Sequence, residues 1–358
     1  MNNVKEFNWA ITEWLIEYNF KRPHQALGNI PPILFAQKHQ KSVTDVLILY
    51  IGLTKVSDRG KLENMQKLNN LLIEYLTEVT REVRERAARG EGREIIGEVI
   101  NRPEDIEIGI DRVGEDILEN LVKKYNVKAT IFSEPNGRDI ENGDDPDFYG
   151  SIDPFDGSVL YLRGFEHNWY SALSFYDKER NPLCCGISDI LNEKFYISGK
   201  EGNYLLDIKT GQKKKISPSS RKTLSEPIVL ASYVMSSQYS AKFLDIFGDL
   251  LKNMHPKALL YPQGGSFIYA FLASGLVNAY VMFDEPRSEI DPGFPMAKKA
   301  GCQIVSVNSD GSYRDYRFIP GKQHDKVDLL IATVTPQLRD ELIKYYVKKY
   351  KEKYSFKI

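Results

Sequence analysis

The longest regular pattern in this sequence predicts an amphipathic helix from Leu62 to about Gly90. Apolar residues recur through this stretch at i, i+3, i+4 and i+7 spacing, which is the period of one helix face. They are Met65, Leu68, Leu72, Tyr75, Leu76, Val79 and Val83. A stripe of this length predicts a helix that faces a hydrophobic core, so we expect a globular fold around it.

Length and charge limit what this globule can bind. At about 150 residues per domain, 358 residues predict roughly two domains or one large two-lobed domain. The composition, 42% hydrophobic and 27% charged, excludes a disordered or collagen-like chain. With 48 basic and 49 acidic side chains the net charge is −1, so no global field favours a nucleic acid or a membrane. We therefore expect neither as a partner.

Cysteine usage and the early apolar stretches predict a cytoplasmic location. Cys184, Cys185 and Cys302 are odd in number, which argues against a disulfide framework and for a reducing compartment. Charges, Trp and Pro interrupt the first 30 residues, so we expect no signal peptide. The apolar stretch at 43–56 is 14 residues long and carries two charges, whereas a membrane span takes about 20 apolar residues.

Strand-like runs follow the long helix and form two groups. The first group looks mostly antiparallel and comprises 128–132, 147–152, 169–176, 184–191 and 194–198. A polar stretch at 213–222 then leads to a strand at 228–233, a helix at 241–254, an apolar run at 267–283, and a strand and helix at 328–350. We predict two lobes, 62–218 and 219–358.

Acidic residues lie at turns that follow these runs. Asp153 and Asp156 share one tight turn, Glu134 ends an earlier strand, and Asp111 lies 23 residues before Glu134. Mg²⁺ prefers oxygen ligands, and one carboxylate can bridge two ions about 3.5 to 4 Å apart. The same turn continues with a Gly and Ser158, whose backbone N–H groups can bind a phosphate. Such residues favour phosphoryl-transfer chemistry, but they also form ordinary solvated turns.

A family resemblance favours the metal interpretation. Residues 153–158 (Asp-Pro-Phe-Asp-Gly-Ser) resemble the Asp-Pro-Ile/Leu-Asp-Gly-Thr/Ser signature of the inositol monophosphatase and fructose-1,6-bisphosphatase superfamily. Residues 264–266 and the apolar run through 279–281 resemble its second-lobe Gly-Ser helix. The likeness runs from about residue 65 to the C-terminus, and 111–158 is most similar to archaeal-type dual phosphatases. It implies an α/β (α+β) fold, a two-lobed layered αβαβα sandwich, often dimeric, with two or three Mg²⁺ ions and, in many members, lithium inhibition.

The resemblance also implies roles for individual residues. Metal ligands would be Glu134, Asp153, the Phe155 carbonyl, Asp156 and one further acidic residue. Asp111 and Ser158 would orient the attacking water, with Glu134 beside them, and Gly157 and Ser158 would bind the phosphate.

The last metal ligand is taken from a count. The family places it 12 positions before the Gly of an Ala-Gly pair, and this count from Gly301 reaches Glu289. The bisphosphatase branch uses Glu at this position, so we predict Glu289. Asp291 is the alternative, and it could instead cap the following helix.

Three departures from the family pattern concern the substrate. Leu160 replaces the usual Asn, and Pro135 stands where a second acidic residue often follows the metal-binding Glu. The segment at 284–288 looks shorter than the archaeal substrate loop. Asp284 within it is a candidate contact for substrate hydroxyls.

The N-terminal segment has a different character. Residues 14–28, followed by Pro31 and Pro32, resemble the C-terminal end of the integrase core of insertion-sequence transposases, without the three upstream carboxylates such a core needs. We interpret 1–42 as an extra helical remnant of a transposase and 43–61 as a linker. Residues 1–64 would then be a fusion scar.

Together these features predict a Mg²⁺-dependent phosphomonoesterase that acts by metal-activated water on a small polyol or sugar phosphate, inositol 1-phosphate or fructose 1,6-bisphosphate. The alternatives are a 3′(2′),5′-bisphosphate nucleotidase and a non-catalytic phosphatase-like binding protein. A homodimer is expected.

Overall fold

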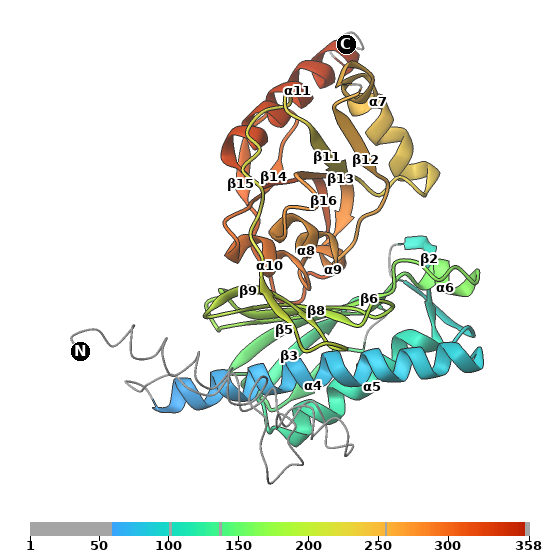
Figure 1. Cartoon of the computed structure of the whole chain (residues 1–358), viewed down its shortest axis with the longest axis vertical. Helices are drawn as coiled ribbons and strands as arrows, with labels where there is room; N and C mark the ends of the chain where they lie inside the picture. The colour runs from blue at the N-terminus through green and yellow to red at the C-terminus, as the bar shows by residue number, and fades with distance from the viewer. Residues whose placement is uncertain (1–58, 100–101, 136–137, 255, 355–358) are drawn as a thin grey trace, which may run out of the picture. The chain divides into compact units, whose positions relative to one another are not determined.

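The computed structural model describes residues 59–99, 102–135, 138–254 and 256–354 (Figure 1). The transposase-like remnant at 1–42 and most of the predicted linker lie outside these residues. Lys67–Ile358 form one compact unit, and the description below concerns this unit.

An eight-stranded sheet forms the first lobe. Its strands are β3 (Ala129–Ser133), β4 (Ile140–Asn142), β5 (Phe148–Asp156), β6 (Tyr170–Tyr176), β7 (Pro182–Asp189), β8 (Lys194–Gly199), β9 (Gly202–Asp207) and β10 (Lys213–Lys215). They lie in the order β10-β9-β8-β7-β6-β5-β3-β4, with β3 and β5 parallel and the other neighbours antiparallel. The antiparallel arrangement predicted for the middle of the chain is confirmed. A separate hairpin joins β1 (Ile95–Val99) to β2 (Arg102–Ile108).

A six-stranded mixed sheet forms the second lobe. Its strands are β11 (Ile228–Ala231), β12 (Ala258–Tyr261), β13 (Ala279–Pro286), β14 (Gln303–Val307), β15 (Tyr313–Asp315) and β16 (Lys326–Thr333). They lie in the order β12-β11-β13-β16-β14-β15. The first sheet ends before this one begins, and the intervening stretch includes residue 219, where the sequence predicts the lobe boundary.

The two sheets and three groups of helices form five layers, which can be followed in Figure 1. Outside the first sheet lie α4 (Arg59–Arg89) and α5 (Gly109–Lys124). Between the sheets lie α8 (Ile268–Ala273) and α10 (Phe294–Lys299), with the short α9 (Arg287–Ile290) nearby. Outside the second sheet lie α7 (Ser237–Met254) and α11 (Pro336–Tyr354), while α6 (Ser158–Leu162) follows β5. The two-lobed layered αβαβα sandwich is confirmed.

The predicted long helix packs as its apolar stripe requires. Its buried face fits the first sheet so closely that a Cβ at Gly186 would lie 2.7 Å from Leu76. Hydroxyl pairs add specific contacts across this layer, with Tyr75 Oη 2.7 Å from Ser171 Oγ. This packing fixes the sheet from which the acidic turn emerges.

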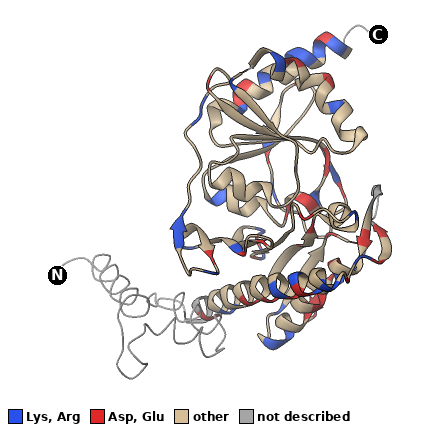
Figure 2. Ribbon diagram, turned by 45° about the vertical axis from the view of Figure 1, so that its right-hand side comes forward, with Lys and Arg blue, Asp and Glu red and all other residues tan. Residues whose placement is uncertain are grey.

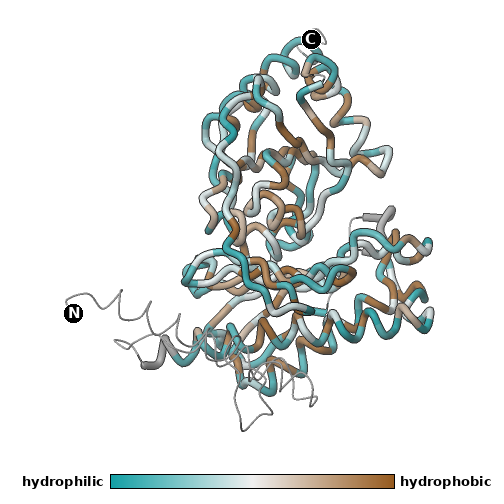
Figure 3. Tube along the Cα trace, viewed as in Figure 1, coloured by the Kyte–Doolittle hydropathy of each residue, from teal (hydrophilic) through white to brown (hydrophobic). Residues whose placement is uncertain are grey.

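The two lobes share one hydrophobic core, and Figure 3 shows apolar strands in both. Tyr170 of β6 stacks on Phe267 with ring centroids 4.2 Å apart. Because rings from both lobes interlock, the residues that each sheet presents at their junction keep a fixed geometry.

Two features of the fold were left open by the sequence. The apolar run at 267–283 is two elements, α8 and then β13, because a turn interrupts it. The sequence reading also omits α5, although Asp111 in its first turn accepts a hydrogen bond from the backbone N–H of Ile108 at 2.7 Å and so closes its N-terminus. Among the described residues, no helix is both long and apolar enough to cross a bilayer.

Candidate metal centre

Three carboxylates from the two lobes meet at the junction between the sheets. Asp153 and Asp156 lie at the end of β5, and Glu289 lies on α9. Each offers one oxygen within 4.8 Å of the others. Figure 2 shows acidic segments gathered between the two sheets. Three oxygen donors at this spacing are a ligand set of the kind that Mg²⁺ prefers.

The surroundings of Asp156 favour a bound cation. Burial and the neighbouring Asp153 and Glu289 carboxylates raise the pKa of Asp156 well above its ordinary value, although the backbone N–H groups of Ser266 and Phe267 donate to it. Its buried Oδ2 has no hydrogen-bond partner among the described residues. A cation at this position would satisfy that oxygen and remove the repulsion between the carboxylates.

A glycine of the second lobe makes room for this carboxylate. Gly265 has φ +110°, and a Cβ there would lie 2.3 Å from Asp156 Oδ2. A side chain would therefore collide with the carboxylate, and the positive φ already favours glycine. The Gly-Ser motif at 264–266 thus brings backbone donors against Asp156.

Glu134 joins the same cavity from the neighbouring strand. Its backbone N–H donates to the carbonyl of Ile152 at 3.0 Å, which holds the end of β3 beside β5. Glu134, Asp153 and Phe155 all line the cavity. The structure therefore brings together the expected ligands Glu134, Asp153, Phe155, Asp156 and Glu289.

Asp111 reaches the cavity through Ser158. The hydroxyl of Ser158 donates to Asp111 Oδ1 at 2.8 Å and lies 2.9 Å from the carbonyl oxygen of Phe155. Asp111 is buried, whereas Gly157 and Ser158 line the cavity. The backbone at Gly157 has φ +120°, and a Cβ there would lie 2.2 Å from the carbonyl oxygen of Asn168, so this turn needs glycine.

The structure distinguishes Glu289 from Asp291. Glu289 belongs to the acidic cluster, whereas Asp291 Oδ1 accepts a hydrogen bond from the hydroxyl of Tyr316 at 2.7 Å. Burial raises the pKa of Asp291 to about 7. Asp291, directly after α9, therefore belongs to a buried network with Tyr176 and Tyr316.

Asp284 lies apart from the acidic cluster. Its carboxylate pairs with Lys242 of α7, and it is not among the described residues that line the cavity. The neighbouring Glu285 lines the cavity instead and accepts a hydrogen bond from the hydroxyl of Tyr280 at 2.5 Å. The shortened segment at 284–288 thus presents a different carboxylate from the one the sequence suggested.

The cavity has a volume of about 420 Å³, and residues of both lobes line it. Residues that the sequence did not single out complete it, and they share no motif by which they could have been found. Among them are Arg163, Phe165, Asn168, Met235 and Gln263. They meet here because loops of both lobes converge on this junction.

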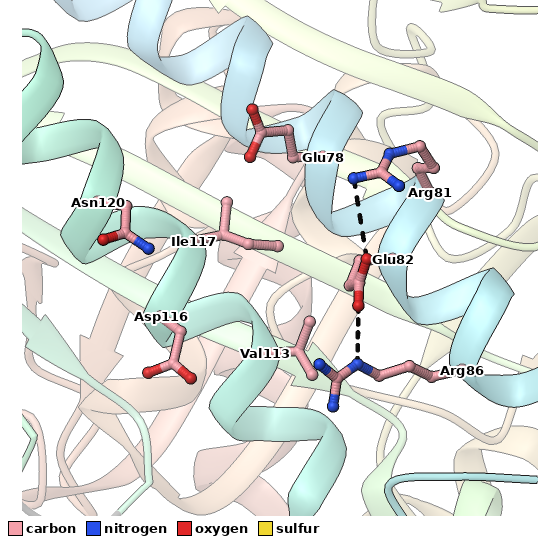
Figure 4. A pocket seen from close by; sticks show the side chains of 8 residues that line it. All are labelled: Glu78, Arg81, Glu82, Arg86, Val113, Asp116, Ile117 and Asn120. Atoms are coloured by element: carbon pink, nitrogen blue, oxygen red, sulfur yellow. Dashed lines mark hydrogen bonds and ion pairs between the residues drawn. The ribbon is translucent and has the colours of Figure 1, made fainter.

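A second, smaller cavity of about 140 Å³ lies between α4 and α5 (Figure 4). Glu82 bridges Arg81 and Arg86 along its α4 side. Both arginines of the lining are thus paired with Glu82.

Comparison with known proteins supports the fold and the N-terminal resemblance. A family model described as "Integrase core domain" matches residues 1–32. The Nus factor SuhB of Pasteurella multocida is 20% identical over 256 residues, which are 71% of this chain and 91% of that protein.

Solved structures agree with this relationship. SuhB of Bartonella henselae aligns with a TM-score of 0.60 at 16% identity over 78% of this chain and 98% of that one. The inositol monophosphate complex of SaIMPase-II, the Staphylococcus aureus inositol monophosphatase II, aligns with a TM-score of 0.58 at 14% identity over 80% and 96%. The same enzyme has been solved with 2′AMP bound. The described chain therefore has the fold of the inositol monophosphatases and SuhB proteins, joined to an N-terminal segment similar to an integrase core.

Proposed function

We propose that this protein is a Mg²⁺-dependent phosphomonoesterase that hydrolyses a small phosphorylated polyol, sugar or nucleotide. The observation that carries the proposal is the meeting of Asp153, Asp156 and Glu289, whose oxygens lie within 4.8 Å of one another beside a cavity of about 420 Å³. Three carboxylates this close repel one another unless cations lie between them. A phosphate ester brings further negative charge, which the same cations would hold.

The donor set fits two or three Mg²⁺ ions. Glu134, Asp153 and the Phe155 carbonyl would hold one ion, and Asp153 and Asp156 another, with Glu289 as the last ligand. Bound there, such ions supply charge stabilisation for the phosphoryl oxygens and for the leaving alkoxide. The unpartnered Oδ2 of Asp156 supports this assignment.

Asp111 and Ser158 would prepare the attacking water. Asp111 Oδ1 fixes the Ser158 hydroxyl at 2.8 Å, so that the hydroxyl's lone pairs can accept a hydrogen bond from water at the cavity wall. A buried carboxylate that aligns its donor in this way orients the nucleophile without a covalent intermediate. The backbone N–H groups of Gly157 and Ser158 would bind the phosphate.

Two alternatives have specific support. The 2′AMP complex of the Staphylococcus aureus relative supports a nucleotidase with the same chemistry. The description of the Pasteurella relative as a Nus factor supports a binding protein with protein partners. The three buried free cysteines suit a reducing cytoplasm, and we retain the homodimer as an expectation.

Phosphate release tests the proposal. We expect release from at least one of inositol 1-phosphate, fructose 1,6-bisphosphate and adenosine 3′,5′-bisphosphate with Mg²⁺, none with EDTA, and loss of release in Asp153→Asn. If folded wild-type protein releases no phosphate from any phosphomonoester, the binding-protein alternative replaces the proposal.

A further inference from the structure

The loop between β15 and β16, residues 316–325, belongs to the second lobe but contacts the first. Phe318, which is 2% exposed, packs against Phe132 of β3 with ring centroids 6.1 Å apart. The side-chain amide of Gln323, which is 7% exposed, donates a hydrogen bond to Asp139 Oδ1 at 3.2 Å. The loop is therefore attached to β3 and to the segment that leads from β3 to β4.

Asp139 connects this loop to the end of β3. Its Oδ1 also accepts a hydrogen bond from the backbone N–H of Ser133 at 3.3 Å. Ser133 is the last residue of β3, and its hydroxyl donates to Glu115 Oε1 of α5 at 2.7 Å. Glu134, an expected metal ligand, is the next residue in the chain. Since Ser133 is held through both its backbone and its side chain, the start of the Glu134 backbone has a fixed position relative to Asp139.

The main chain of the same loop holds α9. The carbonyl oxygen of Gln323 accepts a hydrogen bond from the backbone N–H of Ser288 at 2.7 Å, and that of Asp325 accepts one from Arg287 at 3.0 Å. The first N–H groups of a helix have no partner within the helix, so these two carbonyls satisfy the N-terminus of α9. Glu289, the expected ligand from the second lobe, directly follows Ser288.

These contacts form one continuous chain, which we call the Ser133–Ser288 bridge. It runs from the Ser133 N–H through the Asp139 carboxylate and the side chain and carbonyl of Gln323 to the Ser288 N–H. Both of its ends adjoin an expected metal ligand, one in each lobe. Mg²⁺ requires nearly ideal octahedral geometry with oxygens at about 2.0 to 2.1 Å, so a metal centre shared by two lobes needs a fixed separation between them.

We propose that Gln323 is a positioning residue of the metal centre. Through the Ser133–Ser288 bridge it sets the separation of Glu134 and Glu289. Neither Gln323 nor Asp139 is among the described residues that line the cavity, so Gln323 acts on the metal through other residues. This inference rests on the proposed Mg²⁺-dependent function and adds to it how the two lobes are held for metal binding.

Gln323→Ala tests the side-chain link, because it keeps the carbonyl that accepts the Ser288 N–H. We expect the affinity for Mg²⁺, measured by calorimetric titration, to fall about tenfold, in the range of a hydrogen bond to a charged group. At saturating Mg²⁺ kcat should return toward the wild-type value, since no group at the cavity is changed. The matched control is Gln303→Ala on β14, which removes a 3.2 Å hydrogen bond to Gly301 within the second lobe and should leave Mg²⁺ affinity unchanged.

A reciprocal exchange tests whether the bridge itself is responsible. Gln323→Glu places two carboxylates opposite each other and should weaken Mg²⁺ binding at least as much as Gln323→Ala. In the double variant Asp139→Asn/Gln323→Glu, the new amide can donate to the new carboxylate, and its oxygen can still accept the Ser133 N–H. We expect the double variant to regain most of the Mg²⁺ affinity that Gln323→Glu loses. A general loss of stability would not be reversed by this second substitution.

Hydrogen exchange provides a readout that needs no metal. In EDTA the Ser288 N–H should exchange faster in Gln323→Ala than in the wild type and in Gln303→Ala, because the loop that accepts it is no longer attached to the first lobe. The melting temperature of each variant in EDTA separates this local change from global unfolding.

The outcomes distinguish the inference from the proposed function. If the wild type binds Mg²⁺ and Gln323→Ala binds it equally well, the positioning role is wrong and the proposed function stands. The role is also wrong if Gln303→Ala loses as much affinity, if the double variant binds no better than Gln323→Glu, or if exchange at Ser288 is unchanged. Wild-type protein that binds no Mg²⁺ overturns the proposed function, and the positioning role with it.

Discussion

Ser158 Oγ donates a 2.8 Å hydrogen bond to Asp111 Oδ1, across 47 positions in sequence. The other oxygen of the same carboxylate accepts the backbone N–H of Ile108 at 2.7 Å. Asp111 thus closes the N-terminus of α5 with one oxygen and orients the cavity hydroxyl with the other. A substitution at Asp111 therefore affects both the N-terminus of α5 and the Ser158 hydroxyl. Its effect on activity has to be measured together with its effect on stability.

Asp111→Asn should lower kcat by about 10²- to 10⁴-fold, the range associated with a positioned acid–base group. The affinity for Mg²⁺ should change little, because Asp111 lies outside the acidic cluster. Steady-state kinetics and Mg²⁺ titration check this. The matched control is Asp310→Asn, which removes the charge of the acceptor in the same type of Asp–Ser hydrogen bond, 2.7 Å to Ser312, at an exposed turn and should leave kcat unchanged. A normal kcat in Asp111→Asn would contradict the proposed role.

Asp156→Asn should raise the melting temperature in EDTA and lower the stabilisation that Mg²⁺ provides. The neutral amide removes repulsion from Asp153 and Glu289, but it also removes a metal ligand. A ligand at 100 times its Kd stabilises a protein by about 2.7 kcal/mol, so the loss is measurable as a smaller Mg²⁺-dependent rise in Tm. Glu289→Gln should reduce that rise too, whereas Asp291→Asn should keep it. An equal rise in Asp156→Asn and wild type would exclude Asp156 as a ligand.

The raised pKa of Asp291 predicts that the difference in stability between the wild type and Asp291→Asn depends on pH. Burial raises its pKa from 3.8 to about 7, opposed by Tyr316 and Arg287. The folded state therefore keeps a proton that the unfolded chain loses, and this contribution is fully present below about pH 4 and lost as pH rises to 7. Relative to Asp291→Asn, the wild type should lose about 1.4 kcal/mol of unfolding free energy per pH unit in that window, and nothing further above it. Urea unfolding in EDTA at several pH values measures this, and a pH-independent difference between the two proteins would contradict it.

Gly265→Ala should abolish Mg²⁺ binding although it lowers the stability of the protein only modestly. The added Cβ would lie 2.3 Å from Asp156 Oδ2 and would push the carboxylate out of the cluster. Gly301→Ala is the control, because Gly301 also has positive φ, +94°, but a Cβ there would meet no described atom within 4 Å. Both variants should lose about 1 to 2 kcal/mol from backbone strain, whereas only the first should lose metal affinity. Calorimetric Mg²⁺ titration of the two variants separates the effect of backbone strain from the effect of the collision between the added Cβ and the Asp156 carboxylate.

Deletion of residues 1–64 should leave phosphatase activity and Tm nearly unchanged. The first side chain described as buried in α4 is Leu68, so the deletion removes no described part of the core. Thermal unfolding and phosphate release of the shortened chain test this. A collapse of either quantity would show that the integrase-like segment is part of the working protein.

The amino-acid sequence by itself determined the elements with strong local patterns. The stripe from Met65 to Val83 specified the long helix, because a helix face repeats every few residues whatever lies opposite it. The turn at 153–158 specified the family resemblance, since its two carboxylates and its glycine lie within six consecutive residues and can be recognised without knowledge of the rest of the fold. That resemblance and the layered fold are confirmed by the structural neighbours.

Only the tertiary structure decided which distant groups meet. Glu289 and Asp291 are two residues apart, and the sequence could rank them only by a count. The packing of α9 turns Glu289 toward the acidic cluster and leaves Asp291 with Tyr316. Phe165 and Met235 carry no motif, and their shared cavity follows from the junction of two sheets. Such proximity depends on chain segments far apart in sequence, and no local pattern encodes it, which is why the ligand roles remain predictions for the experiments above.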